Sequence, residues 1–280
     1  DRTTCEGAPL PEGHTIHRLA RDHRPLLVGR PVSAASPQGR FATGAEMLTG
    51  RVVEEVEPYG KHLFYVFAGD VLLHVHLGLY GSFTRGTGPA PAPRGALRLR
   101  MVVDDGADGT WIDLRGPTAC ELFTPADQDA VLARLGPDPL RKDADPTPAW
   151  RRLSRSRTVV GALLMDQSVL AGVGNVYRAE VLYRAGLSPF RPGREVPQDV
   201  FDGMWQDLRV LMRAGVRAGH IVTTAREDRD RRSGTARRED RFYVYRRQGL
   251  PCRRCGTPIR TELMVGRNLF WCPVCQPAAA

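Results

Sequence analysis

Four cysteines near the end of the chain constrain its fold more than any other feature. They form two C-x2-C pairs, with 16 residues between the pairs. This is the spacing of a four-thiolate zinc site, in which each pair occupies a tight turn and the two turns close a tetrahedron around the metal. Because four protein ligands leave no open position, we expect one Zn²⁺ in a structural role. The predicted ligands are Cys252, Cys255, Cys272 and Cys275.

The same cysteines could instead form two disulfides, but no secretory signal supports an oxidising environment. Between the two pairs, residues 259–264 and 265–271 have the pattern of two short strands in a hairpin. Residues 246–267 carry six arginines against one acid, which favours a phosphate-binding role for this hairpin. The chain has six cysteines, and we expect the other two, Cys5 and Cys120, to be free thiols.

The charge of the chain indicates a polyanionic partner. Forty basic residues against 31 acidic ones give a formal net charge of +9. This balance favours nucleic acid, although a merely soluble basic surface would have the same composition. Only two basic residues are lysines, Lys61 and Lys142, so a lysine within a motif is conspicuous. No run approaches the roughly 18 apolar residues of a membrane span, so we expect no membrane partner and a cytoplasmic, nucleoid-associated protein.

Apolar periodicity divides the chain into a β-rich first half and a helical second half. Residues 15–24 predict a helix that Pro25 ends. Segment 86–95 is typical of a surface loop, and segment 223–241, which has no apolar period, is predicted to be a mobile loop. The predicted strands are 51–68 (two runs), 71–83, 97–103 and 110–114. The predicted helices are 125–134, 147–154, 158–166, 175–185 and 197–214.

Three motifs follow one another along the chain: PEGHTI at residues 11–16, QSVLAGVGNVYR at residues 167–178, and Gly266-Arg267-Asn268 before Cys272. In order and spacing they resemble motifs of the formamidopyrimidine-DNA glycosylase and endonuclease VIII family. Residues 11–16 (PEGHTI) resemble its N-terminal signature, and residues 167–178 (QSVLAGVGNVYR) resemble its helix–two-turn–helix element. Gly266-Arg267-Asn268, shortly before Cys272, is similar to its zinc finger. The resemblance covers about residues 11–276, and PEGHTIHR and GKHLF place the chain nearest the actinobacterial endonuclease VIII branch.

The resemblance implies an α+β fold with three parts: an N-terminal β-sandwich-like domain with an N-terminal helix, a C-terminal helical helix–two-turn–helix domain, and a zinc-finger β-hairpin. The expected divisions are an extra segment 1–10, a catalytic domain 11–133, a hinge 134–141, a DNA-binding domain 142–222, a mobile loop and linker 223–245, and a zinc finger 246–276.

The resemblance also implies a bifunctional DNA glycosylase/AP lyase of base excision repair that acts on oxidised bases, with pyrimidines favoured. Such enzymes flip the damaged base out of the duplex. Pro11 would attack the sugar C1′ through its amine and form an iminium, followed by β- or β,δ-elimination. Glu12 would act as general acid and base, and Lys61 would bind a phosphate beside the lesion.

The remaining implied contacts are with DNA. Leu79 and Tyr80 would fill the space left by the flipped base, and Asn175 and Arg267 would bind phosphates. Gly78 stands where some relatives carry a polar residue that contacts the orphaned base. The expected partner is damaged double-stranded DNA, bound by a monomer.

Each motif taken alone has a structural alternative. Pro11-Glu12 would serve as a turn before a helix, Leu79-Tyr80 as edge-strand packing, and Asn175 as a helix cap. His74 and His76 alternate on a strand, but the sequence places no acid or cysteine beside them, so we interpret them as structural. The functional interpretation is favoured because all three motifs occur together, in the order and at the spacing of the family.

One departure bears on the chemistry. Ten residues, DRTTCEGAPL, precede Pro11, and an internal proline has an amide nitrogen with no lone pair for nucleophilic attack. The natural protein could start at Leu10, the segment could be an appended expression sequence, or the chain could have lost the chemistry. The last case predicts a non-catalytic, zinc-dependent damaged-DNA-binding protein. A third hypothesis is a zinc-ribbon module for RNA or transcription.

Overall fold

The computed structural model describes residues 11–104 and 108–278 of the chain. The predicted extra segment 1–10, with Cys5, lies outside these residues. The chain divides into two compact units, the first ending at Arg134 and the second beginning at Leu135. Each unit has its own apolar core. Among the described helices, none has the length and apolar composition to cross a membrane.

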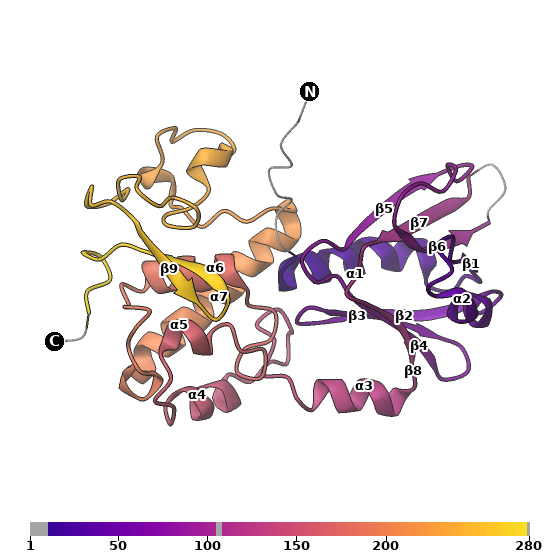
Figure 1. Cartoon of the computed structure of the whole chain (residues 1–280), viewed down its shortest axis with the longest axis horizontal. Coiled ribbons are helices and arrows are strands. Elements are labelled where there is room, and N and C mark those ends of the chain that lie inside the picture. The colour runs from indigo at the N-terminus through magenta and orange to yellow at the C-terminus, as the bar shows by residue number, and fades with distance from the viewer. Residues whose placement is uncertain (1–10, 105–107, 279–280) are drawn as a thin grey trace. The chain divides into compact units, whose positions relative to one another are not determined.

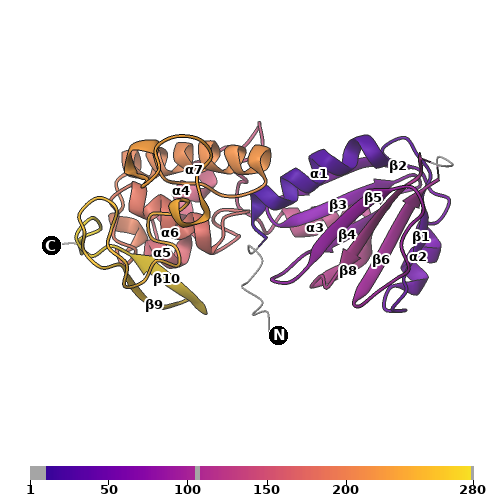
Figure 2. The same ribbon diagram turned by 90° about the horizontal axis from the view of Figure 1, so that it is seen from above.

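Within the described residues, the first unit is built from two four-stranded antiparallel sheets and three α-helices (Figures 1 and 2). The strand orders are β1-β6-β7-β5 and β2-β3-β4-β8. The elements are α1 (Gly13–Leu27), β1 (Ser33–Ala35), α2 (Ala42–Leu48), β2 (Val53–Tyr59), β3 (His62–Phe67), β4 (Val71–His76), β5 (Ser82–Thr87), β6 (Leu97–Val103), β7 (Thr110–Arg115), β8 (Ala119–Phe123) and α3 (Pro125–Leu132).

Side-chain alternation along the strands explains why the two sheets pack together. On β3, Leu63 and Tyr65 are fully buried in the core, and Met101 of β6 and Ile112 of β7 enter the same core from the other sheet. Because successive side chains on a strand point to opposite faces, the residues between them lie on the outer faces. The sandwich-like N-terminal domain expected from the resemblance is therefore confirmed.

Two of the elements predicted for this unit are corrected by the structure, which also adds β1, α2 and β8. The prediction that Pro25 ends the first helix is wrong, because α1 continues through Pro25 to Leu27. Proline lacks only one backbone donor there, in the last turn, and the continuation buries Leu27 completely. The predicted strand 71–83 is instead two strands, β4 and β5, which belong to different sheets and are joined by residues 77–81.

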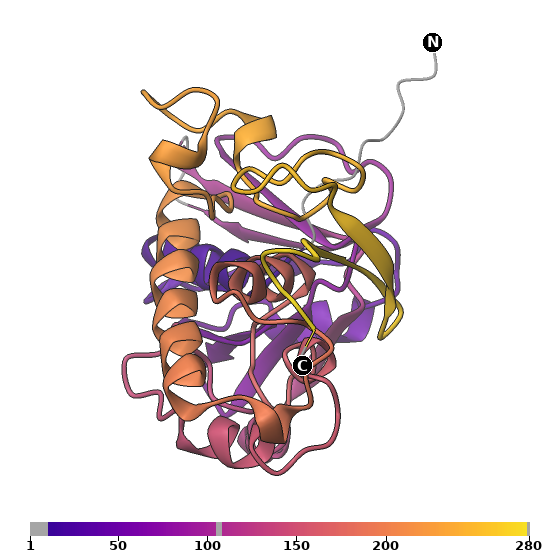
Figure 3. The same cartoon turned by 90° about the vertical axis from the view of Figure 1, so that its left-hand side faces the viewer.

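Up to residue 278, where the described part of the chain ends, the second unit contains four α-helices, three short 3-10 helices and a two-stranded hairpin. Figure 3 shows its longest helix, α7, in orange and the β9–β10 hairpin in yellow. The elements are α4 (Thr147–Leu153), α5 (Val160–Leu163), α6 (Asn175–Arg184), η2 (Gly193–Glu195), α7 (Gln198–Ala218), η3 (Arg226–Asp228), η4 (Arg238–Asp240), β9 (Arg260–Met264) and β10 (Arg267–Trp271).

The loop between α5 and α6 is fixed by one side chain. The Gln167 side-chain amide donates to the carbonyl oxygens of Met165 and Val173, and its oxygen accepts from the Gly172 amide. Within the predicted hinge 134–141, the Gly136 amide donates to the Gln167 carbonyl oxygen. The two-turn element predicted from the family motif is thus held by hydrogen bonds from its own glutamine.

The predicted loop 223–241 has an irregular backbone that contains η3 and η4. Its two ends are nevertheless joined to each other. The Thr223 amide donates to the Arg241 carbonyl oxygen at 2.9 Å, and the Thr224 hydroxyl donates to the Asp240 carbonyl oxygen at 2.6 Å. These bonds hold the two ends of the segment side by side, a feature that its charged sequence did not indicate.

Candidate functional site

The first candidate residues lie at the start of α1. Pro11 is half-buried and immediately precedes Glu12, the N-cap residue of α1. The backbone carbonyl oxygen of Glu12 accepts from the Thr15 amide at 2.8 Å. Its side chain makes no capping hydrogen bond, although Glu12 is only 1% exposed. Burying a carboxyl group is costly, so a buried acid that does not cap its helix is a candidate for chemistry.

Lys61 occupies the tight turn between β2 and β3. Tyr59 and His62 pair across the turn, so Gly60 and Lys61 form a two-residue hairpin loop. Gly60 has φ of 57°, the left-handed conformation that such a loop requires and that glycine adopts without strain. The lysine is therefore presented at the end of a strand pair whose register is fixed by the sheet.

A cluster of histidines follows Lys61 on the outer face of the same sheet. His62 Nδ1 lies 2.9 Å from His74 Nε2, and His74 Nδ1 lies 2.9 Å from an oxygen of Glu121. The expectation that His74 has no acid beside it is therefore wrong, because β8 pairs with β4 and places Glu121 directly opposite His74. Burial lowers the pKa of His62 to about 3 and also lowers the pKa of both His74 and His76. These rings are neutral at pH 7.

The loop after β4 presents the candidate wedge. Tyr80 is 87% exposed, Leu79 is half-buried, and Leu77 beside them is buried. The Gly81 amide donates to the Leu77 carbonyl oxygen at 2.9 Å, which closes the loop. An aromatic ring this exposed contributes little to the core, so edge-strand packing does not account for Tyr80.

Gly78 in this loop has φ of 65° and leaves no room for a side chain. A Cβ atom there would overlap with the hydroxyl of Thr118. The absence of a polar side chain at this position thus follows from the local backbone and from the neighbouring threonine.

Asn175 and the zinc hairpin meet in the second unit. The Asn175 side-chain amide donates to the Asn268 carbonyl oxygen at 3.0 Å, and its oxygen accepts from the Arg178 guanidinium. Arg178 is completely buried and also donates to the Gly161 carbonyl oxygen at 3.3 Å and to that of Met264 at 3.4 Å. The start of α6 is therefore tied to the hairpin, one residue from Arg267.

Arg267 opens β10 and is half-buried. It pairs with Met264 across a two-residue turn, in which Val265 and Gly266 both have positive φ, 54° and 65°. Two successive left-handed residues form the turn that matches the twist of a hairpin. The turn thus fixes the register that places Arg267 next to Asn268.

The four predicted zinc ligands converge. Their sulfur atoms lie within 4.8 Å of one another, with Cys252 Sγ 3.8 Å from Cys275 Sγ and Cys255 Sγ 3.4 Å from Cys272 Sγ. A tetrahedron with Zn–S bonds of about 2.3 Å has edges of about 3.8 Å, so the set fits zinc. All four are free cysteines, which excludes the disulfide alternative, and Cys120 is free as well.

Groups around the four cysteines favour metal binding by their sulfur atoms. The Tyr183 hydroxyl lies 3.1 Å from Cys252 Sγ, as an outer-shell donor to a thiolate would. Hydrogen bonds from Thr257 lower the pKa of Cys255 to about 6, so this group is a thiolate at neutral pH. The predicted structural zinc site is confirmed.

The predicted residues fall into two groups. Pro11, Glu12, Lys61, Leu79 and Tyr80 belong to the first unit. Asn175, Arg267 and the zinc ligands belong to the second, where hydrogen bonds join Asn175 to the arginine-bearing hairpin.

Two residues of these surroundings were missed by the sequence analysis. Arg178 was quoted only as part of a motif, although it lies three residues after Asn175 and thus on the same face of α6. Glu121 gave no signal, because its contact with His74 depends on a strand pairing between distant segments.

Comparison with known proteins covers nearly the whole chain. Residues 10–120 match the formamidopyrimidine-DNA glycosylase N-terminal domain, residues 135–227 match the H2TH domain of the same glycosylase, and residues 249–278 match the zinc finger found in FPG and IleRS. Endonuclease 8 1 of Mycobacterium tuberculosis is 53% identical over 95% of this chain and 100% of its own length. Formamidopyrimidine-DNA glycosylase of Thermus thermophilus is 33% identical over 95% of this chain and 98% of its own.

Solved structures agree. The crystal structure of the MutM (Fpg) protein from Thermus thermophilus has a TM-score of 0.75 at 31% identity and covers 96% of this chain and 100% of its own. Lactococcus lactis Fpg, solved with abasic-site DNA, shares the fold at 24% identity and a TM-score of 0.78, covering 95% of this chain and 100% of its own. The domain order, the zinc site and these relatives together show that the chain belongs to the formamidopyrimidine-DNA glycosylase and endonuclease VIII family of DNA-repair glycosylases and AP lyases.

Proposed function

We propose that the chain removes oxidised bases, pyrimidines foremost, from duplex DNA through an iminium at Pro11. The Pro11 nitrogen attacks C1′ of the damaged nucleotide, and the base departs with the bonding electron pair and takes up a proton. Loss of the nitrogen proton and opening of the sugar ring, in which the C1′–O4′ bond breaks and O4′ takes up a proton, give the iminium, which acidifies the C2′ hydrogen. Removal of that hydrogen expels the 3′ phosphate by β-elimination, and a second elimination expels the 5′ phosphate. Water then hydrolyses the iminium and restores the amine.

The buried Glu12 carries this proposal. It follows Pro11 directly, is 1% exposed, and does not use its side chain to cap α1. A buried carboxyl group beside the attacking amine is placed to transfer protons to and from the departing base and the sugar ring. We assign Glu12 this acid–base role.

Lys61 and the second unit supply phosphate contacts in this proposal. Lys61 stands in a two-residue turn on a rigid sheet, a placement that suits an ammonium group holding one phosphate. Asn175 retains one amide hydrogen beyond the one given to Asn268, and Arg267 adjoins that residue on the hairpin. Zinc, when bound, holds the two cysteine turns together and takes no part in the reaction.

Tyr80 and Leu79 act as the wedge in the proposal, because the exposed ring of Tyr80 is free to enter the base stack.

The proposal that oxidised pyrimidines are the favoured substrates is supported by the 53% identity to a protein named endonuclease 8. We propose that the chain works as a monomer on damaged duplex DNA in the cytoplasm. We propose for this function the same domain boundaries that the sequence analysis gives.

The chemistry requires an amine at Pro11, so the decisive experiment compares two chains. Borohydride trapping on abasic-site DNA is performed with a chain that begins at Pro11 and with the full 280-residue chain. We expect a covalent adduct only from the first, and none once its N-terminal amine is blocked by acetylation. Glu12→Gln in the same background tests the acid–base role, since it should slow base removal while the protein still binds lesion DNA.

The second candidate function is a zinc-dependent reader of damaged DNA without catalysis. Its motivation is the ten residues that precede Pro11 in the sequence. No adduct from either chain, together with tight binding to lesion duplex, would establish this function and overturn the iminium proposal. A preference for RNA over lesion duplex would instead support the zinc-ribbon alternative.

A further inference from the structure

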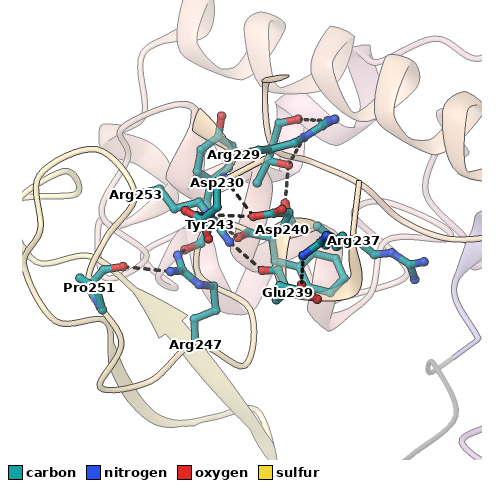
Figure 4. A network of polar contacts seen from close by, with 12 residues as sticks. Arg229, Asp230, Arg237, Glu239, Asp240, Tyr243, Arg247, Pro251 and Arg253 are labelled. Carbon is teal, nitrogen blue, oxygen red and sulfur yellow. Dashed lines mark hydrogen bonds and ion pairs between the residues drawn. The ribbon is translucent and has the colours of Figure 1, made fainter. Parts of the chain in front are cut away.

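Two arginines lie between the first pair of zinc ligands and hold the 226–241 segment. Arg253 and Arg254 are the two residues separating Cys252 from Cys255. Figure 4 shows Arg253 pointing into a network that includes Asp230, Glu239 and Asp240. The Arg253 side chain is 6% exposed, so its charge lies inside the protein and not on the surface.

Arg253 makes contacts with both arms of the segment. On the C-terminal arm its guanidinium donates to the Glu239 carbonyl oxygen at 2.6 Å and to that of Phe242 at 3.2 Å, and lies 3.2 Å from a carboxylate oxygen of Asp240. On the N-terminal arm it lies 3.6 Å from Asp230. Asp240 is 1% exposed, and such a partner offsets the cost of burying a carboxylate.

Arg254 fastens the N-terminal arm at a second point. Its guanidinium stacks over the rings of Tyr183 and Tyr243, 5.5 and 5.0 Å from their centroids, and its Nε donates to Asp228 at 3.2 Å. The Tyr243 hydroxyl donates to the same carboxylate at 2.7 Å. The segment is thus attached to the zinc turn at both arms by adjacent residues.

This attachment covers part of the acidic charge of the segment. The least exposed acids, Asp228 and Asp240, face the two arginines of the zinc turn. Ala236 is buried, which anchors the far part of the segment as well. Five arginines of the segment are exposed, against three exposed acids, Glu227, Asp230 and Glu239. The exposed arginines are Arg226, Arg231, Arg232, Arg237 and Arg238.

We propose that Arg253 and Arg254 hold residues 226–241 as a fixed arginine surface that binds the phosphate backbone of DNA. Arginine suits this partner because its planar guanidinium matches phosphate oxygens and remains charged. Holding the segment in place reduces the ordering cost that a free loop would pay on binding. Zinc therefore acts on DNA binding at two places, the hairpin with Arg267 and this surface. The choice of DNA as partner rests on the proposed function.

The first test measures the attachment without DNA. Asp240→Asn removes the buried charge from the segment, and Arg253→Gln removes its partner from the zinc turn. Hydrogen exchange of the amides in 226–241 should accelerate by about tenfold or more in both variants. Zinc content, measured in parallel, should remain one per chain in Asp240→Asn, which lies outside the cysteine turn. Unchanged exchange in Asp240→Asn, with zinc retained, would overturn the attachment.

The second test measures the surface itself on an undamaged duplex. The double variant Arg231→Gln/Arg232→Gln should bind more weakly. Its plot of log affinity against log salt should also be shallower, by about 0.9 for each phosphate that the protein no longer neutralises. The matched control is Arg151→Gln/Arg213→Gln, which removes two exposed arginines from α4 and α7 of the same unit. Equal slopes for the two double variants would overturn the proposal that this surface binds DNA phosphates.

The two tests also separate this proposal from the proposed function. Neither uses a lesion or measures strand cleavage. If borohydride trapping fails while the slopes differ as expected, the iminium chemistry is wrong and the arginine surface stands. If trapping succeeds and the slopes are equal, the enzyme function stands and the surface is wrong.

Discussion

His62 Nδ1 lies 2.9 Å from His74 Nε2, and this hydrogen bond fixes the protonation of both rings. The Glu121 carboxylate accepts from His74 Nδ1, so His74 Nε2 carries the lone pair. His62 must then donate from Nδ1 and carry its own lone pair on Nε2. A charged His62 would be placed beside Lys61, which also opposes its protonation.

This arrangement predicts that acid destabilises the protein. Burial lowers the pKa of His62 to about 3 and that of His23 to about 4, both below the 6.5 of the unfolded chain. At pH values between the folded pKa of each histidine and 6.5, the unfolded chain binds more protons than the folded one. The stability is therefore complete above pH 6.5 and is lost as the pH falls toward 4, by up to about 1.4 kcal/mol per pH unit for each such histidine.

Urea unfolding at pH 7 and pH 5 measures this loss. The variant His62→Gln can still donate to His74 but has no ring to protonate, so its unfolding free energy should fall less on acidification. His17→Gln, outside the cluster, serves as control and should behave as the parent does. Equal pH dependence in His62→Gln and the parent would show that the cluster does not contribute.

Glu180 is predicted to be essential for stability. It is fully buried on α6, and its two oxygens accept from the Thr223 hydroxyl and from the consecutive amides of Tyr243, Val244 and Tyr245. In Glu180→Gln an amide group replaces one acceptor and faces these donors. We expect a loss of about 2–4 kcal/mol of unfolding free energy, since buried donors are left unpaired.

Thermal and urea unfolding measure the effect, with the exposed Glu195→Gln as the matched control. The control should differ from the parent by less than about 0.5 kcal/mol. A Glu180→Gln protein as stable as that control would mean that the donors left by the lost oxygen find other acceptors, contrary to the expectation.

Metal removal should disable DNA binding without unfolding the first unit. Cys272→Ser deletes one ligand of the zinc site, and the hairpin carrying Arg267 then loses the constraint that holds it. We expect loss of the bound zinc and of affinity for lesion duplex, while the near-ultraviolet signal of the first unit persists. Cys120→Ser, at a free thiol in β8, should retain both the metal and the affinity.

Tyr80 should matter for DNA and not for folding. Its ring is 87% exposed, so Tyr80→Ala should leave the unfolding temperature unchanged. If the ring enters the base stack, its removal should cost about 1–3 kcal/mol of binding to abasic-site duplex. Val210→Ala, which truncates another exposed apolar side chain on α7, is the control for binding. Equal affinities for the two variants would remove Tyr80 from the interface.

Local patterns in the sequence account for the features predicted correctly. The cysteine pairs, the Pro11-Glu12 signature and the strand–turn pattern around Lys61 each lie within a few residues, so their spacing alone determines their geometry. The missed features all join distant segments. Glu121 contacts His74 across a strand pair, 47 residues apart in the sequence, and Arg253 contacts the Asp240 carboxylate and the backbone carbonyl oxygens of Glu239 and Phe242. The pattern of charged residues in the sequence shows which residues are able to form ion pairs, but it does not show which two of them meet.

The last prediction concerns why position 78 is glycine. Its φ of 65° disfavours any side chain, and a Cβ there would overlap with the Thr118 hydroxyl. Gly78→Ala should therefore cost more than the roughly 1–2 kcal/mol of the left-handed backbone alone. Gly50→Ala isolates that backbone cost, because Gly50 has φ of 81° and nothing within 4 Å of its Cβ position. Adding Thr118→Ala to Gly78→Ala should recover the difference between them, measured by urea unfolding of the three variants and the parent. If Gly78→Ala costs no more than Gly50→Ala, the Thr118 hydroxyl does not restrict this position, and a polar side chain could be accommodated at the wedge.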